Sequence, residues 1–99
     1  MELDELSTAD FVALLRQQFS LYAGGTVPLN AELLQVTELG AAAPNAKRKP
    51  FSIILRGPRD RRLPQMIYKV QHEKLGAFEI FLVPVGVDEK GYHYEAVFN

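Results

Sequence analysis

The clearest pattern in the chain is the run GAFEIFLVPVG, in which apolar side chains occupy nearly every position after the first glutamate. In an extended strand, successive side chains point to opposite faces. Phe78, Ile80 and Leu82 therefore share one face, while Phe81 and Val83 lie on the other. Because both faces are apolar, we expect this strand to be covered on both sides.

A charged turn, VDEKG, separates this run from a second apolar stretch, YHYEAVFN. Gly91 can adopt the left-handed conformation that closes a short hairpin loop with a bulge, so the two runs predict a β-hairpin at the centre of a small core. On the second arm, Tyr92 and Tyr94 share a face with Ala96 and Phe98. This pattern favours core or half-buried aromatic residues, and the alternative is an exposed edge strand that recruits a partner.

Helical spacing is confined to the N-terminal region of the sequence. An apolar stripe that begins at Phe11 predicts a helix over about residues 8–16, with Ser7 or Thr8 as its cap. A helix this short is not stable alone, so we expect it to dock on the rest of the protein.

Alternation with period two predicts four strands before the hairpin, over residues 18–22, 27–36, 51–56 and 65–72. A phase slip at Leu33-Leu34 in the second of these predicts a β-bulge. Residues 40–49 are mostly small or basic, which predicts a mobile loop.

Six short strands with regularly spaced turns are typical of an all-β domain. We therefore predict a mainly β fold, a six-stranded antiparallel barrel or closed sandwich, with the short helix packed on it or plugging its end. A chain of 99 residues forms one domain, here residues 1–99.

Composition excludes several kinds of chemistry. The chain has no cysteine, which excludes thiol catalysis, disulfides and thiolate metal sites. Its start is acidic rather than basic, and no apolar run reaches the roughly 18 residues of a spanning helix. We expect a cytoplasmic protein with no membrane partner.

The charges are unevenly distributed along the chain. The net charge is −1, yet residues 47–62 carry a balance of +6 and the remainder −7. This segment is the candidate surface for an anion or an acidic protein, including another copy of the chain, and its alternative is a solvated loop. Nucleic acid is not favoured, since the only aromatic residue there is Phe51, which alternation assigns to the core. The candidate residues are Lys47, Arg48, Lys49, Arg56, Arg59, Arg61 and Arg62.

His72 and His93 are the only histidines, and their spacing matches no metal-ligand motif. No serine, threonine or lysine lies in a recognisable nucleophile motif. We therefore predict no metal site, no catalytic residues and no cofactor.

Three stretches resemble a known family: PFSIILRGP, LPQMIYKVQHEKLGAFEIFLVPVG and GYHYEAVFN. They are similar to a family of small bacterial proteins described only as a domain of unknown function, and the resemblance covers nearly the whole chain. Met66 stands where that family would be expected to have glycine, and Glu73-Lys74 where proline is common after the histidine. The resemblance implies an association with phage-tail-like genes and supplies no catalytic residues.

Two functional hypotheses follow from the sequence. The favoured one is a non-enzymatic structural or protein-interaction module, a component or accessory of a tail-like assembly or a self-associating protein. The alternative is a β-barrel that binds a small molecule or an anion, with catalytic use of His72, His93 and nearby carboxylates.

Overall fold

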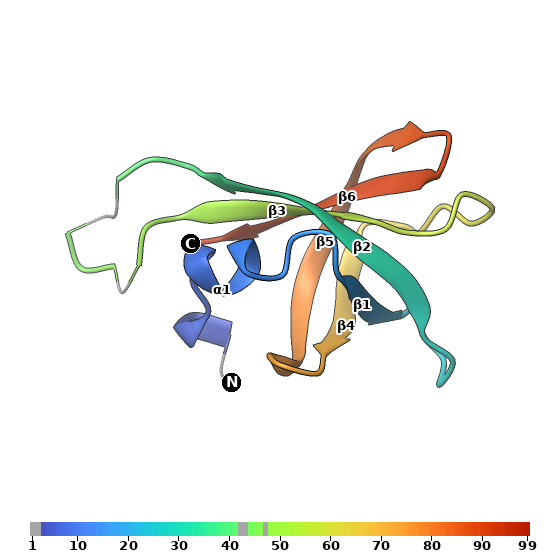
Figure 1. Cartoon of the computed structure of the whole chain (residues 1–99), viewed down its shortest axis with the longest axis horizontal. Helices are drawn as coiled ribbons and strands as arrows, with labels where there is room; N and C mark the ends of the chain where they lie inside the picture. The colour runs from blue at the N-terminus through green and yellow to red at the C-terminus, as the bar shows by residue number, and fades with distance from the viewer. Residues whose placement is uncertain (1–2, 42–43, 47) are drawn as a thin grey trace.

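All six predicted strands form one closed antiparallel barrel in the computed structural model, which describes residues 3–41, 44–46 and 48–99 (Figure 1). The order around the barrel is β1-β2-β3-β6-β5-β4, and β1 pairs with β4 to close the ring. The fold prediction is confirmed as a barrel rather than a sandwich. The elements are η1 (Leu3–Glu5), α1 (Thr8–Val12), β1 (Gln18–Tyr22), β2 (Leu29–Glu38), β3 (Phe51–Arg56), β4 (Met66–His72), β5 (Gly76–Asp88) and β6 (Gly91–Phe98).

The long strand β5 changes partner along its length. Residues 76–82 pair with β4, whereas the pairing with β6 begins at Val83, which lies opposite Glu95. A bulge between Pro84 and Gly86 bends the strand beyond this point. Proline lacks the N–H that a ladder needs, so it is tolerated at such an irregularity. The first half of β5 therefore diverges from the end of β6.

The predicted bulge in β2 is confirmed, because the register against β3 shifts between Leu33 and Gln35. Inward-facing side chains of all six strands fill the barrel, among them Tyr94, Phe19 and Leu55, which have almost no exposure. The core interpretation of Tyr94 is therefore confirmed. The edge-strand alternative is wrong, because β6 lies between β3 and β5.

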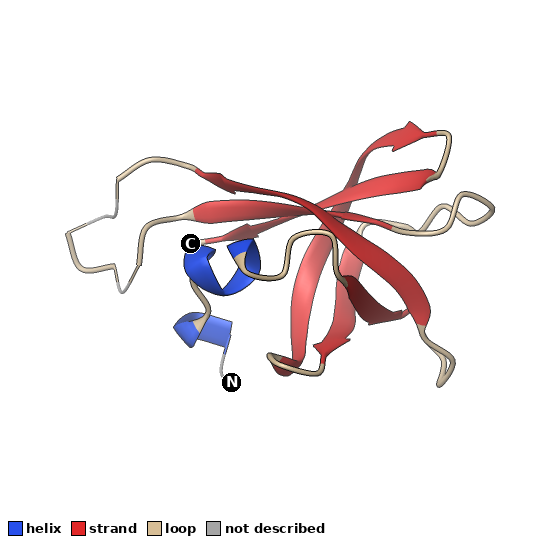
Figure 2. Cartoon of the chain, viewed as in Figure 1, coloured by secondary structure: helices blue, strands red, loops and turns tan. Residues whose placement is uncertain are grey.

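The short helix α1 plugs one end of the barrel (Figure 2). Its fully buried Phe11 contacts four other rings, with centroid distances between 5.3 and 6.3 Å. These rings belong to Phe19, Phe51, Phe78 and Phe98, which come from four different strands. Through Phe11 the helix therefore packs against four of the six strands.

The helix ends at Val12, four residues before the predicted end. The chain continues in tight turns, with an N–H of Gln17 bonded to the carbonyl of Leu14, and Arg16 adopts a φ of 70°. The backbone groups of Arg16 and Gln17 also bond to Leu33 of β2, at 2.8 and 3.1 Å. The helix cannot continue because these residues already join the sheet. Neither helix in the described ranges is long and apolar enough to cross a membrane.

Gly91 has a different role from the one predicted. Its φ is not in the left-handed region, where only Gly24, Gly40 and Gly76 lie among the described glycines. Instead, a Cβ at position 91 would lie 1.9 Å from the carbonyl oxygen of Gly57. Glycine is needed there because the β5–β6 turn approaches the backbone after β3.

The outer face of β5 is not covered, which corrects the expectation of burial on both faces. Phe78, Ile80 and Leu82 point into the barrel and are buried, whereas Phe81 is 48% exposed. Phe81 stays exposed because η1 and α1 lie towards one end of the barrel (Figure 2). The apolar outer positions of β5 therefore need another explanation.

Candidate functional site

The predicted basic segment does not form a single basic surface. Arg48 is half-buried, and its Nη1 donates to the carbonyl oxygens of Leu3 and Leu6 at 2.9 and 2.8 Å. Its guanidinium also lies 5.6 Å from the ring centroids of Phe51 and Phe98. Arg48 thus fastens η1 to the barrel. Lys47 lies outside the described residues.

Arg56 forms ion pairs with two carboxylates. Its guanidinium donates to Glu32 and to Asp88, each at 2.9 Å, and its side chain is only 13% exposed. The hydrogen bond that Arg56 donates to Asp88 is the main cause of its raised pKa, and burial acts in the opposite direction. These contacts occupy the guanidinium groups of Arg48 and Arg56, and anion or partner binding by the basic residues stays a prediction.

The remaining basic candidates are exposed. Lys49 precedes β3, while Arg59, Arg61 and Arg62 lie in the loop between β3 and β4. Arg59 donates to the backbone carbonyl of Asp88 at 2.6 Å. Binding of an acidic partner by this smaller set stays a prediction.

The two histidines lie in separate networks. His72 is buried, its Nδ1 accepts the N–H of Lys74, and its Nε2 lies 2.9 Å from Oε1 of Gln17. These contacts fit a neutral ring with the proton on Nε2. His93 instead lies 2.8 Å from Oδ2 of Asp88. Across the described ranges, no three histidine or carboxylate side chains gather in a group that could hold a metal ion.

Asp88 is the centre of the second network. Its Oδ1 accepts the N–H groups of Lys90 and Gly91, which fixes the β5–β6 turn. The hydrogen bond from His93, together with those from Arg56 and the two amides, holds the pKa of Asp88 well below its usual range. The hydrogen bonds of Arg56 to Glu32 and Asp88, and of His93 to Asp88, join β2, β3, β5 and β6, so the cluster is a structural link.

An exposed apolar surface lies on the outside of β4, β5 and β6. Ile67 and Phe81 are direct cross-strand neighbours and are 59% and 48% exposed. Val97 of β6 and Leu3 of η1 are also exposed, at 51% and 39%. We call these four residues the apolar face.

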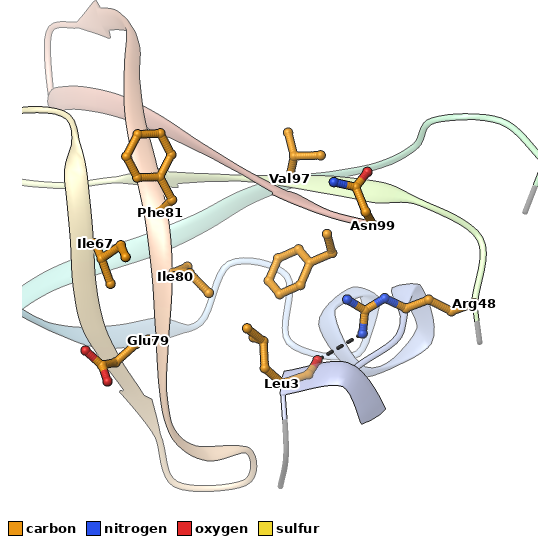
Figure 3. A pocket seen from close by; sticks show the side chains of 9 residues that line it. Leu3, Arg48, Ile67, Glu79, Ile80, Phe81, Val97 and Asn99 are labelled. Carbon is orange, nitrogen blue, oxygen red and sulfur yellow. Dashed lines mark hydrogen bonds between the residues drawn. The ribbon is translucent and has the colours of Figure 1, made fainter. Parts of the chain in front are cut away.

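The apolar face surrounds a hollow of about 480 Å³ (Figure 3). The hollow lies where β5 diverges from β6, and Ile80 and Phe98 form part of its wall. Arg48 and Leu3 close one side of it, joined by the hydrogen bond drawn in Figure 3. Glu79 and Asn99 provide the polar part of the lining.

The outer surface of β1 and β4 has the opposite character. A hollow of about 620 Å³ there is lined mainly by polar side chains, including Gln18, Ser20, Tyr22 and Gln71. Ser20 and Gln71 are cross-strand neighbours. The barrel therefore has a polar side and an apolar side.

The sequence contained a signal for the apolar face, namely an outer position of β5 occupied by phenylalanine. We interpreted that signal as burial within the domain. Only the strand order shows that the neighbours Ile67 and Val97 bring further apolar groups to the same surface.

Comparison with known proteins identifies the family. No curated protein and no solved structure matches the chain. Residues 6–98 match a family model described as "Domain of unknown function (DUF6916)". The resemblance to a small domain of unknown function is thereby confirmed at this level, and the chain belongs to the DUF6916 family.

Proposed function

We propose that this protein is a non-enzymatic protein-interaction module that binds a protein partner through the apolar face. The observation that carries the proposal is the exposure of Ile67, Phe81 and Val97 around one hollow. Single exposed apolar residues are normal on a protein surface, but a contiguous group marks an interaction site.

The size of the apolar face also supports the proposal of a protein-interaction site. An aromatic side chain has a total of roughly 150–250 Å², so the half-exposed Phe81 leaves on the order of 100 Å² in water, and the three aliphatic residues each leave somewhat less. The four residues together leave on the order of 400 Å² exposed, in the range of roughly 300–600 Å² that is often functional. A partner with apolar side chains would remove this surface from water.

The filled interior favours this proposal over the ligand-binding alternative. Phe11, Phe19, Leu55 and Tyr94 occupy the space in which a ligand-binding barrel would hold its ligand. The hollows described above open at the surface instead. His72 and His93 belong to different networks, which does not favour a shared catalytic site for the two histidines.

A tail-like assembly is the setting that we propose for this interaction, on the strength of the sequence resemblance alone. A subunit of such an assembly needs an apolar surface to contact its neighbour. The basic residues Arg59, Arg61 and Arg62 would then steer the approach of an acidic partner.

Site-specific photocrosslinking tests the proposal. p-Benzoylphenylalanine replaces Phe81 on the apolar face or, as a matched aromatic control, Tyr22 on the polar side of the barrel. After irradiation in cells, position 81 is expected to give protein adducts that position 22 does not. Equal labelling at the two positions, or none at either, would contradict the proposal.

A further inference from the structure

We infer that the occupant of the apolar face is a second copy of this chain, related by a two-fold axis that passes close to Phe81. This inference rests on the proposed function and specifies its partner. It draws on the shape, the charge and the size of the apolar face.

The shape of the apolar face is self-complementary. Phe81 is about half exposed and borders a hollow of about 480 Å³ on the same side of the barrel. A cavity of about 150 Å³ already admits a benzene ring. In a two-fold arrangement, Phe81 of each copy can therefore enter the hollow of the other, and the same contact forms twice.

The charges around the apolar face also allow it to meet a copy of itself. Lys69 and Glu79 are exposed cross-strand neighbours next to the Ile67–Phe81 pair. On the other side, Arg48 lines the hollow and the half-buried Glu95 lies two residues from Val97. The rim thus carries charges of both signs. A rim of one sign would repel a second copy, whereas a rim of both signs lets opposite charges of two copies meet.

The area matches a small specific dimer. Two copies would bury on the order of 800 Å² of exposed apolar surface, which is twice the area estimated for one apolar face. Because apolar atoms make up roughly 65% of a homodimer interface, the corresponding total is about 1,200 Å². That value lies at the lower end of the size range of specific interfaces. We therefore expect a dimer that forms reversibly.

The first experiment is sedimentation of the purified protein at tens of micromolar. The chain has a mass of 11.1 kDa, and we expect a species of twice that mass. Phe81→Glu should shift the protein to the monomer, because it places a charge inside the interface. Val27→Glu is the matched control, since Val27 is 78% exposed in the β1–β2 turn, and it should remain dimeric. Circular dichroism checks that each variant is folded. If Phe81→Glu is unfolded, Ile67→Lys replaces it as the interface variant.

Single-cysteine crosslinking gives an independent result, because the chain has no cysteine of its own. Val97→Cys should form a disulfide-linked dimer on mild oxidation, and the more exposed Val27→Cys should not. If both react equally, the crosslinks arise from collision and the inference fails. A monomeric wild-type protein would also overturn it.

The two proposals fail separately. Photocrosslinking at position 81 to a different protein, with a monomer in sedimentation, would refute the second copy and leave the interaction module standing. A monomer that also gives no selective adduct at position 81 would refute both.

Discussion

Removing the aromatic plug should cost the barrel a large part of its stability. Phe11 is fully buried, and its ring contacts four other rings. Truncating a buried phenylalanine to alanine typically costs about 3–5 kcal/mol. We expect the upper half of that range, since each aromatic pair adds about 0.5–1.5 kcal/mol beyond burial. For a domain of this size, with a total of about 5–15 kcal/mol, the loss is at least a quarter of the stability.

Urea denaturation of Phe11→Ala measures the effect. Val12→Ala is the control, since Val12 lies on the same helix and is 48% exposed. Alanine has the higher helix propensity at both positions, so a difference between the two variants reports the ring contacts. The control should change the free energy of unfolding by less than about 0.5 kcal/mol. If Phe11→Ala costs less than about 1 kcal/mol, the helix does not hold the barrel end closed.

The remaining predictions concern β5 and its turn. Leu82→Ala should lower the free energy of unfolding by about 2–5 kcal/mol, because the side chain is buried within the barrel. At protein concentrations low enough to keep the chain monomeric, the exposed Phe81→Ala should cost less than about 1 kcal/mol. Equal losses in denaturant titrations of the monomer would show that both faces are covered within the domain. The lowered pKa of Asp88, caused first by the hydrogen bond from His93, predicts acid sensitivity. In the unfolded chain Asp88 takes up a proton near its ordinary pKa of 3.8, whereas in the folded protein it does so only at lower pH, so the free energy of unfolding should fall as the pH drops below 3.8. Asp88→Asn should weaken this dependence of stability on pH. Parallel pH profiles of the unfolding free energy for wild type and variant would contradict this.

The pattern of side chains predicted the strands well, because inward positions must be apolar at every second residue. Residues 51–56 were predicted as a strand, and β3 has these bounds. The bulge at Leu33 was also predictable, because a bulge shifts the phase of the alternating pattern. The end of the helix could not be predicted from the local pattern. Its stop at Val12 depends on the backbone hydrogen bonds of Arg16 and Gln17 with Leu33, which is distant in the sequence.

The candidate site was harder to predict for two reasons. An apolar outer position looks the same in sequence whether its cover is part of the same chain or not, so the pattern alone predicts that Phe81 is covered within the domain. Charge in a segment also does not show where each side chain points. Arg48 and Arg56 belong to a basic run in sequence, but in the structure one binds carbonyl groups and the other binds carboxylates.

The order of strands in the barrel also has a consequence for folding kinetics. β6 lies between β3 and β5, and β1 closes the ring with β4, so two of the six pairings join segments distant in the sequence. Loop closure has to precede such contacts, and proteins dominated by them fold in milliseconds to seconds. During synthesis, β3 has no partner on its second side until β6 has been added, since their ladder begins with His93 opposite Arg56. Until then its apolar side chains are available to other chains, and this interval is when the protein is most exposed to aggregation.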